Sequence, residues 1–339
     1  MSRPILIVDD EPTNLATLRQ ILSPEYSLVF ARNGSEALAA VAKHHPALIL
    51  LDVMMPDMDG YAVCRTLKAD PKTENIPVIF VTGLADVGDE TAGFAVGAVD
   101  YIIKPVSSPI VKARVHTHLS LVSAKQLEQS YHEAIYMLGV ASEFRDTDTG
   151  IHIWRMAAYC KALAIACDWK EAASNKLELA AMMHDIGKIG IPDSILLKPG
   201  KLNAAEWEII RSHTTVGHDI LSKGSAEIIL MAAVVALYHH ERWDGHGYPC
   251  GLAGEAIPEA ARIVSVADVF DALSMNRPYK EAWPLERVME TMTKGAGTQF
   301  DPRIIEALIG ILPDILEIQA HWDEINVATG SVAKSISLG

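Results

Sequence analysis

Two pairs of adjacent polar residues constrain the fold of this chain more than any other feature of its sequence. His184-Asp185 and His239-His240 each lie in a run of apolar residues with helical spacing. Burying such groups is unfavourable unless something occupies their lone pairs. A cluster of divalent metal ions does this, because a carboxylate can bridge two ions and imidazoles can fill the remaining positions. We therefore expect the segment from His184 to Tyr279 to fold around a metal centre.

The composition is typical of a globular protein with about two domains. The 339 residues are 50% hydrophobic and carry a formal net charge of −14. A charge of that sign argues against DNA or membrane binding through a basic patch. The cysteines form no close-spaced pair, a strand-like run begins almost at once and leaves no room for a signal peptide, and no apolar run is long enough to span a bilayer. We expect a cytoplasmic protein with no DNA binding and no membrane insertion.

Residues 1–122 alternate short apolar runs with amphipathic segments. The alternation predicts a five-stranded parallel sheet covered by helices on both faces, with chemistry at the carboxyl ends of the strands. The predicted strands are 5–8, 28–31, 48–51, 78–81 and 101–103, and the predicted helices are 12–22, 35–44, 60–69 and 88–96.

Polar residues follow these predicted strands at the edge where their carboxyl ends meet. The carboxylates of Asp9, Asp10 and Asp52 would repel one another unless they shared a cation, and their oxygens suit Mg²⁺. Asp52 can then act as a nucleophile toward a phosphoryl group, whose oxygens Thr82 and Lys104 are placed to hold. Any one of these residues alone would be read as a turn or cap residue, but five of them at matched positions favour a phosphoryl site.

Segments 5–12, 52–60 and 101–105 resemble the receiver domain of two-component response regulators, which has a flavodoxin-like fold. The resemblance implies that a sensor histidine kinase is a partner and that Asp52 is the phosphoacceptor. It also implies the Mg²⁺ ligands Asp9, Asp10, Asp52 and Met54, the last through its backbone carbonyl, and the switch residues Thr82, Tyr101 and Lys104.

A long helical stretch follows, with no Gly or Pro between Ile110 and Leu138. We assign residues 123–140 as a helical linker. It can be a loosely packed connection, but we favour a continuous helix that pairs with its copy in a homodimer and carries a signal between the domains.

Residues 141–313 are predicted to be entirely helical, and residues 314–339 to be a partly disordered C-terminal extension. Helical spacing covers 152–167, 174–186, 204–212, 216–222, 226–239, 259–275 and 284–294.

The helical region supplies enough ligands for two metal ions. Consecutive on a predicted helix, His184 and Asp185 would diverge by about 100° and could serve neighbouring ions. Lys188 would lie one helical turn from His184, where it can meet a phosphate oxygen. The further candidate ligands are His213, His239, His240 and Asp268 at the edges of helical runs, and Asp148 and His152, which lie four residues apart. A helix N-cap is a competing role for Asp148.

Two such ions with a bridging water can clamp a phosphodiester for in-line attack. Tyr248 lies in a glycine-rich loop, and together with Arg277 and Tyr279 it can stack on a base or hydrogen-bond a phosphate. A turn with packed aromatic rings is the competing interpretation of that loop.

His184-Asp185-x-Gly-Lys and the run from His239 to Pro249, His-His-Glu-x-Trp-Asp-Gly-x-Gly-Tyr-Pro, resemble the HD-GYP family over residues 136–312. This family is the metal-dependent subgroup of HD phosphohydrolases that hydrolyses cyclic di-GMP. The resemblance implies metal ligation by His184, Asp185, His213, His239, His240 and Asp268, with His152 and Asp148 completing a third position. The family often has Glu where this chain has the shorter Asp148. The resemblance also implies phosphate contacts for Lys188 and Arg277, Tyr279 beside the ligand, and a family-defining loop at Gly247, Tyr248 and Pro249, which contacts either substrate or a partner signalling protein.

The sequence therefore predicts a phosphorylation-controlled phosphodiesterase in which His184, Asp185 and Lys188 are catalytic. It would open cyclic di-GMP to pGpG, to GMP or to both, using two or three ions of iron or manganese, or of zinc. The alternative is a slow, metal-loaded module that senses the dinucleotide or docks other proteins. Because no ligand is lost from the motifs, we favour the enzyme. A mixed cyclic dinucleotide is a further candidate substrate, since it differs only in base contacts.

Overall fold

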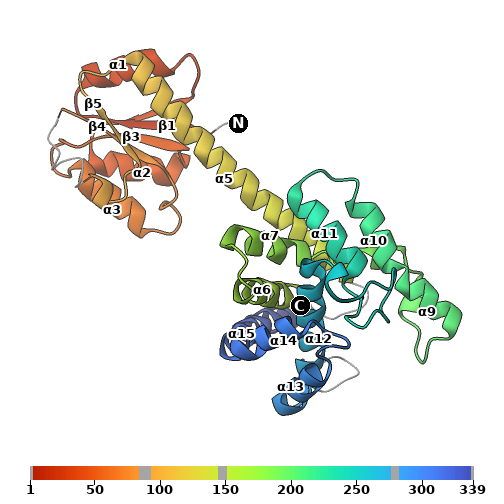
Figure 1. The fold of residues 1–339 in the computed structure, drawn as a ribbon. Coiled ribbons are helices and arrows are strands. Elements are labelled where there is room, and N and C mark those ends of the chain that lie inside the picture. The colour runs from red at the N-terminus through yellow and green to blue at the C-terminus, as the bar shows by residue number, and fades with distance from the viewer. Residues whose placement is uncertain (1–2, 84–92, 144–150, 276–281, 337–339) are drawn as a thin grey trace. The chain divides into compact units, whose positions relative to one another are not determined.

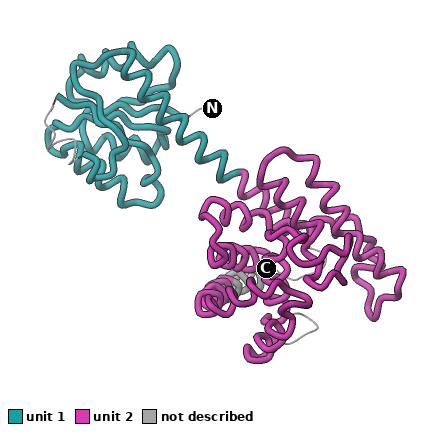
Figure 2. The backbone as a smooth tube through the Cα atoms, in the orientation of Figure 1, with its two compact units in different colours: residues 1–130 teal, residues 131–339 magenta. Residues whose placement is uncertain are grey.

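The computed structural model describes residues 3–83, 93–143, 151–275 and 282–336. The chain divides into two compact units, residues 1–130 and residues 131–339, shown in teal and magenta in Figure 2. The domain boundaries expected at residues 122 and 140 stay predictions, because both positions lie inside one helix, α5 (Ser108–Glu143).

The first unit is built on a parallel sheet of five strands in the order β2-β1-β3-β4-β5 (Figure 1). In β1, β3 and β4 every residue is buried, as expected for strands covered on both faces. The strands are β1 (Ile5–Val8), β2 (Leu28–Ala31), β3 (Leu48–Asp52), β4 (Val78–Thr82) and β5 (Asp100–Ile103).

Helices cover the two faces of this sheet. Along β1 the side chains alternate, so that Ile5 and Ile7 pack with α1 (Pro12–Leu22) and the start of α5, whereas Leu6 and Val8 belong to a separate core. That second core includes residues of α2 (Gly34–His44) and α3 (Gly60–Ala69). The predicted fold class of the first unit is confirmed. The helix expected at 88–96 lies largely outside the described residues.

Helix α5 is a single uninterrupted helix of 36 residues. The expectation of a continuous helix through the linker is therefore confirmed. Its early residues Val111 and Val115 are buried in the core of the first unit, and Ile135 is buried in the core of the second.

The second unit is helical, as predicted. Buried alanines on α6, α7 and α11, among them Ala157, Ala180 and Ala236, belong to one core cluster and let these helices approach closely. Its helices are α6 (Ile151–Ala166), α7 (Glu171–Ala181), α8 (Asp193–Leu196), α9 (Ala204–Arg211), α10 (His213–Leu221), α11 (Glu227–Tyr238), α12 (Glu259–Ser274), α13 (Leu285–Lys294), α14 (Pro302–Gly310) and α15 (Leu312–Ile336), with 3-10 helices η1 (Ile186–Gly190) and η2 (Gly254–Ala256).

The end of the described chain is helical, and the partly disordered extension expected over 314–339 stays a prediction. Helix α15 begins at Leu312 and continues to Ile336, the last residue that the structure describes. Ile315 is fully buried in the core of the second unit, and the indole of Trp322 stacks on Trp154 of α6 with ring centroids 5.6 Å apart. These tertiary contacts stabilise a helix whose own apolar periodicity is weak.

Candidate functional site

Three carboxylates meet at the carboxyl edge of the sheet. Asp9, Asp10 and Asp52 follow or end β1 and β3, and each places an oxygen within 4.8 Å of the others. Nζ of Lys104 lies 2.8 Å from Oδ2 of Asp9 and 2.8 Å from Oδ2 of Asp52. The lysine thus neutralises part of the charge, and the oxygen-rich set fits Mg²⁺.

The charges at this edge influence one another. Burial raises the pKa of Asp52 despite the opposing hydrogen bond and charge of Lys104. Burial alone would lower the pKa of Lys104, but its hydrogen bonds to Asp52 and Asp9 raise it. The pair therefore favours a protonated lysine beside carboxylates that attract a further cation.

The loop after β3 is held close to Asp52. A Cβ added to Gly60 would lie 2.2 Å from the carbonyl oxygen of Asp52, so only glycine allows this return of the chain. The backbone N–H of Met54 lies 3.4 Å from Oδ1 of Asp52 and donates to it. The expected role of the Met54 carbonyl toward Mg²⁺ stays a prediction.

The two expected switch residues lie on neighbouring strands. Thr82 ends β4 and is buried, and Tyr101 lies on β5 with its ring half-buried. The rings of Tyr101 and Phe94 form a T-shaped pair with 6.2 Å between centroids, and the guanidinium of Arg114 on α5 lies 5.5 Å from the Tyr101 ring centroid. A movement of Tyr101 would therefore change its contact with Arg114 on α5.

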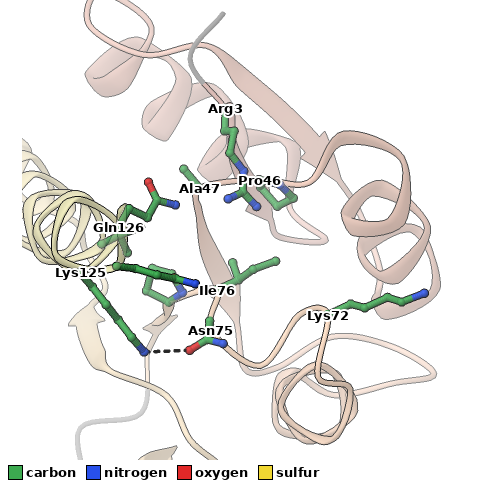
Figure 3. A pocket seen from close by; sticks show the side chains of 11 residues that line it. Arg3, Pro46, Ala47, Lys72, Asn75, Ile76, Lys125 and Gln126 are labelled. Atoms are coloured by element: carbon green, nitrogen blue, oxygen red, sulfur yellow. Dashed lines mark hydrogen bonds between the residues drawn. The ribbon is translucent and has the colours of Figure 1, made fainter. Parts of the chain in front are cut away.

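A separate hollow of about 210 Å³ lies at the opposite, amino-terminal edge of the sheet (Figure 3). Arg3, Ala47 and Pro77, which precede the strands, line it, and Nζ of Lys125 lies 3.1 Å from Oδ1 of Asn75 there. Asp9, Asp10, Asp52, Thr82 and Lys104 are not among its lining residues, so the hollow is separate from the cluster of carboxylates.

In the second unit the fold brings together two groups of candidate metal ligands. In each group the candidate ligand atoms all lie within 4.8 Å of one another. Group A is Asp185, His213, His239 and His240, and group B is His152, His184 and Asp268.

The carboxylate of Asp185 lies between the two groups. Its Oδ1 is 3.2 Å from Nε2 of His213 and 3.7 Å from Nε2 of His239. Its Oδ2 is 3.2 Å from Nε2 of His184 and 2.9 Å from Nζ of Lys188. One oxygen faces group A and the other faces a histidine of group B, which is the geometry of a bridging carboxylate.

The main chain determines which imidazole nitrogen faces the centre. Nδ1 of His184 lies 3.0 Å from the Ala181 carbonyl, Nδ1 of His213 lies 2.7 Å from the Ile210 carbonyl, and Nδ1 of His239 lies 3.0 Å from the Val235 carbonyl. A carbonyl oxygen only accepts, so each Nδ1 carries the proton and donates it. The Nε2 lone pairs then point at Asp185, an arrangement that suits a bound cation.

The electrostatics of the centre favour metal ligation. Burial, together with the neighbouring imidazoles, lowers the pKa of His239 and holds the pKa of His240 well below its usual value. Burial would raise the pKa of Asp185, but Lys188 and the histidines hold it well below its usual range. At neutral pH these groups are neutral imidazoles and a carboxylate, which are the forms that bind first-row transition metals.

The expected helix at 174–186 is wrong at its end. Helix α7 ends at Ala181, so His184 lies in a turn and Asp185 precedes η1. A Cβ on Gly187 would lie 1.8 Å from the His213 carbonyl oxygen, and the close approach of these segments replaces the helix with a turn. We expected Lys188 to lie beside His184, four residues earlier on a helix. In the turn, Lys188 instead pairs with Asp185, three residues earlier.

The position of Asp268 within its helix also differs from expectation. It lies well inside α12 rather than at the edge of a helical run. Its Oδ1 is 3.8 Å from Nε2 of His152 on α6, so the crossing of α6 and α12 forms this part of group B.

The Gly247-Tyr248-Pro249 loop forms a wall of the centre. The ring of Tyr248 lies 4.8 Å from that of His240, and the guanidinium of Arg211 lies 5.2 Å from the Tyr248 ring centroid. A Cβ on Gly247 would lie 2.3 Å from the Arg242 backbone nitrogen, so glycine is required there.

Glu241 anchors this loop, and our sequence analysis assigned it no role. Its buried carboxylate accepts hydrogen bonds from the backbone N–H groups of Cys250, Gly251 and Leu252 at 2.7, 3.1 and 3.0 Å. The sequence signal was its place directly after His239-His240 and before the glycine-rich run.

Two buried residues beside candidate ligands were also missed, Asp271 and Arg155. Asp271 lies three residues after Asp268, and Arg155 lies three residues after His152, so helical spacing placed each near a candidate ligand. Asp148, Arg277 and Tyr279, which we expected to contribute ligands and substrate contacts, lie outside the described residues.

Among the described residues, none of the helices has the length and apolar character needed to cross a membrane.

Comparison with known proteins gives matches over both units. The response regulator receiver domain model matches residues 5–116, and an HD domain model matches residues 121–304. A probable cyclic di-GMP phosphodiesterase of Vibrio cholerae is 40% identical over 338 residues, covering 90% of this chain and 77% of that protein. The cyclic di-GMP phosphodiesterase response regulator RpfG of Xanthomonas campestris is 37% identical over 327 residues, covering 90% of this chain and 86% of that protein. A 3'3'-cGAMP-specific phosphodiesterase of Vibrio cholerae is 40% identical over 198 residues, covering 58% of this chain and 36% of that protein.

Proposed function

Because the chain belongs to the family of response regulators that join a receiver domain to an HD domain, we propose that it hydrolyses cyclic di-GMP in a metal-dependent reaction controlled by phosphorylation of Asp52. The observation that carries the proposal is the position of Asp185, with one oxygen toward the histidines of group A and the other toward His184. The named activities of the relatives support the choice of substrate.

Groups A and B would each hold a divalent ion, with Asp185 shared between them. Iron and manganese suit this nitrogen-rich set, and zinc does so too. When bound, the ions supply a water of lowered pKa and stabilise the charge that develops on the phosphoryl oxygens. A third ion would require Asp148 as a further ligand of group B.

The chain's own residues would place the phosphodiester. Lys188 is fixed against Asp185, with its side chain partly exposed, and would hold a phosphate oxygen as a point charge. Tyr248 would shield the centre from bulk water on the side of His240. Arg277 and Tyr279 would contact the phosphate and the nucleoside. Addition of water across one P–O bond, with a proton passing to the leaving 3′ oxygen, opens the ring to pGpG, and a second hydrolysis gives GMP.

The first unit would carry the control. A sensor histidine kinase would transfer a phosphoryl group to Asp52 in the presence of Mg²⁺ bound by Asp9, Asp10, Asp52 and Met54, and Thr82, Tyr101 and Lys104 would respond. We place the receiver in residues 1–122, the linker in 123–140, the HD-GYP domain in 141–313 and a C-terminal extension in 314–339. A cytoplasmic homodimer that pairs through α5, and contacts with signalling proteins through the Gly247–Pro249 loop, complete the proposal.

The test measures metal and turnover together. Protein purified without oxygen is analysed for metal per chain and then assayed with cyclic di-GMP and with 3'3'-cGAMP after loading with iron, manganese or zinc. We expect turnover of cyclic di-GMP that depends on the metal. Bound metal without turnover of either dinucleotide would instead indicate a sensor or docking module. Faster turnover of 3'3'-cGAMP would change the substrate assignment but not the reaction class.

A further inference from the structure

His152 is oriented in a different way from His184, the other histidine of group B, and from His213 and His239 of group A. His184, His213 and His239 each use Nδ1 to contact a main-chain carbonyl, which no substitution can remove. Nδ1 of His152 instead lies 2.5 Å from Oδ2 of Asp271. A side-chain carboxylate therefore performs for His152 the task that the backbone performs for the others.

Asp271 is itself firmly held. It is 1% exposed and lies on α12, one turn after Asp268. Nε of Arg155 lies 2.5 Å from its Oδ1, and Nη2 of Arg155 lies 2.9 Å from its Oδ2, so the guanidinium binds both oxygens. Burial would raise the pKa of Asp271, but His152 and Arg155 lower it, and the group is a carboxylate at neutral pH.

The same arginine reaches the last helix. Nη1 of Arg155 lies 3.5 Å from Oδ1 of Asp323 on α15, whose side chain is 44% exposed. A chain of charges thus runs from the surface of α15 through Arg155 and Asp271 to His152. Such chains fix the geometry of the group at their buried end.

We propose that Asp271 is a positioning residue for the ion of group B, which keeps the His152 proton on Nδ1 and the Nε2 lone pair directed at Asp268. This inference rests on the proposed metal centre and adds a residue that the metal-binding motifs do not include. A carboxylate that accepts from Nδ1–H also makes Nε2 a stronger ligand. Among the described residues of the two groups, Asp271 is seen to hydrogen-bond His152, a member of group B, so its loss should affect group B and leave group A intact.

Replacement by asparagine removes both effects while keeping the shape. The amide of Asp271→Asn carries no charge, and its NH₂ can donate to Nδ1, which moves the His152 proton to Nε2 where an ion should bind. The removal of such a partner typically weakens metal affinity by about 10–100-fold.

The experiment titrates Mn²⁺ into metal-free full-length protein and measures the number of bound ions and their separate affinities by calorimetry and electron paramagnetic resonance. Wild type should bind at least two ions per chain. Asp271→Asn should weaken one of these sites by about 10–100-fold and leave the other unchanged. Asp323→Asn, at the exposed end of the chain of charges, should weaken the same site by a few-fold at most.

Two further variants guard against a general loss of stability. Asp271→Asn combined with Arg155→Met removes the buried pair together, so no buried charge is left unpaired, and the same site should still be weakened. Asp301→Asn is the matched control, because Asp301 is likewise buried and paired with an arginine, Arg262, but caps α14. It should lower thermal stability and leave both metal affinities unchanged.

The outcomes separate this inference from the proposed function. Wild-type affinity at both sites in Asp271→Asn, or equal weakening of both sites, would overturn the positioning role while the metal centre stands. The same weakening in Asp301→Asn would also overturn it, because the effect would then follow stability alone. A wild-type protein that binds no Mn²⁺ would overturn the metal centre and this inference together.

Discussion

Oδ1 of Asp185 lies 3.2 Å from Nε2 of His213, although Asp185 directly precedes the 3-10 helix η1 and His213 begins the separate helix α10. Gly187 makes this approach possible, because a Cβ at that position would lie 1.8 Å from the His213 carbonyl oxygen. The shared carboxylate is therefore a product of backbone packing as much as of the motif that contains it.

Replacement of Asp185 by alanine should remove the carboxylate between groups A and B. Because loss of a residue that only supports a ligand already weakens function by about 10–100-fold, we expect at least about a 100-fold loss of turnover, together with loss of bound metal. Metal per chain and initial rates measure this, and circular dichroism should report an unchanged helix content. Full metal content with near wild-type rates would refute the bridging role.

Replacement of Lys188 by alanine should separate phosphate binding from metal binding. Nζ of Lys188 contacts Asp185 but has no lone pair to give to an ion when protonated. We expect the metal content to persist and kcat/KM to fall by roughly 10–100-fold, as for the loss of a charged hydrogen bond of about 1.5–3 kcal/mol. Lys188→Arg, which keeps the charge, is the control and should retain more activity. Loss of metal in Lys188→Ala would make the lysine a structural partner of the centre.

Much of the first unit could be predicted because its signals are local. Continuous apolar runs identify buried strands, and the carboxyl ends of parallel strands must share an edge, so Asp9 and Asp52 could be placed together without a structure. The candidate ligands of the second unit could be named for a similar reason, since polar residues in apolar helices are conspicuous.

What could not be predicted depends on contacts between distant segments. Apolar spacing continued to residue 186, but the approach of Gly187 to α10 ends the helix early. Arg155 and Asp271 each lie one turn from a candidate ligand, yet their pairing depends on how α6 crosses α12. The stacking of Trp322 on Trp154 likewise stabilises α15 without any strong periodicity in its sequence.

The metal-free protein should lose stability as the pH falls below the ordinary histidine pKa. The folded-state pKa values of His239 and His240 are depressed from 6.5, so between those values and pH 6.5 the unfolded chain binds more protons than the folded chain. The free energy of unfolding must then decrease with falling pH, by at most about 1.4 kcal/mol per pH unit for each histidine. Urea unfolding between pH 5 and 7.5 measures the slope. His240→Asn should reduce it, and a slope of zero in the metal-free wild type would contradict the buried neutral imidazoles.

Replacement of Glu241 by glutamine should loosen the Gly247–Pro249 loop. The carboxylate accepts hydrogen bonds from three backbone N–H groups. The glutamine amide has one acceptor oxygen, and its NH₂ group would point at backbone N–H donors with which it cannot hydrogen-bond. We expect a loss of about 1–3 kcal/mol in the free energy of unfolding and lower turnover, because Tyr248 would no longer be held against His240. Glu255→Gln, at an exposed acid of the same region, is the control and should change neither quantity. Metal content should stay at the wild-type value in both variants.

Helix α5 should carry the control of the metal centre. Within the second unit, Tyr136 of α5 lies against Trp154 of α6 with ring centroids 4.4 Å apart, and a Cβ on Gly139 would lie 2.6 Å from the Met182 carbonyl oxygen. Trp154 lies two residues from His152, and Met182 lies two residues from His184. A rotation of α5 would therefore displace these two histidines of group B.

At the other end of α5, Arg114 lies over the ring of Tyr101, which phosphorylation of Asp52 would move. We therefore expect beryllofluoride to change the phosphodiesterase rate and the oligomeric state of the wild type together, with activation as the expected direction. Asp52→Ala should respond in neither measurement. Gly139→Ala should bind beryllofluoride at Asp52 normally but show a smaller change in rate, because its α5 can no longer pack against Met182. Phosphodiesterase assays measure the rate, and analytical ultracentrifugation of the same samples measures the oligomeric state. An unchanged rate and oligomeric state in the wild type would mean that the receiver serves localisation or partner choice instead.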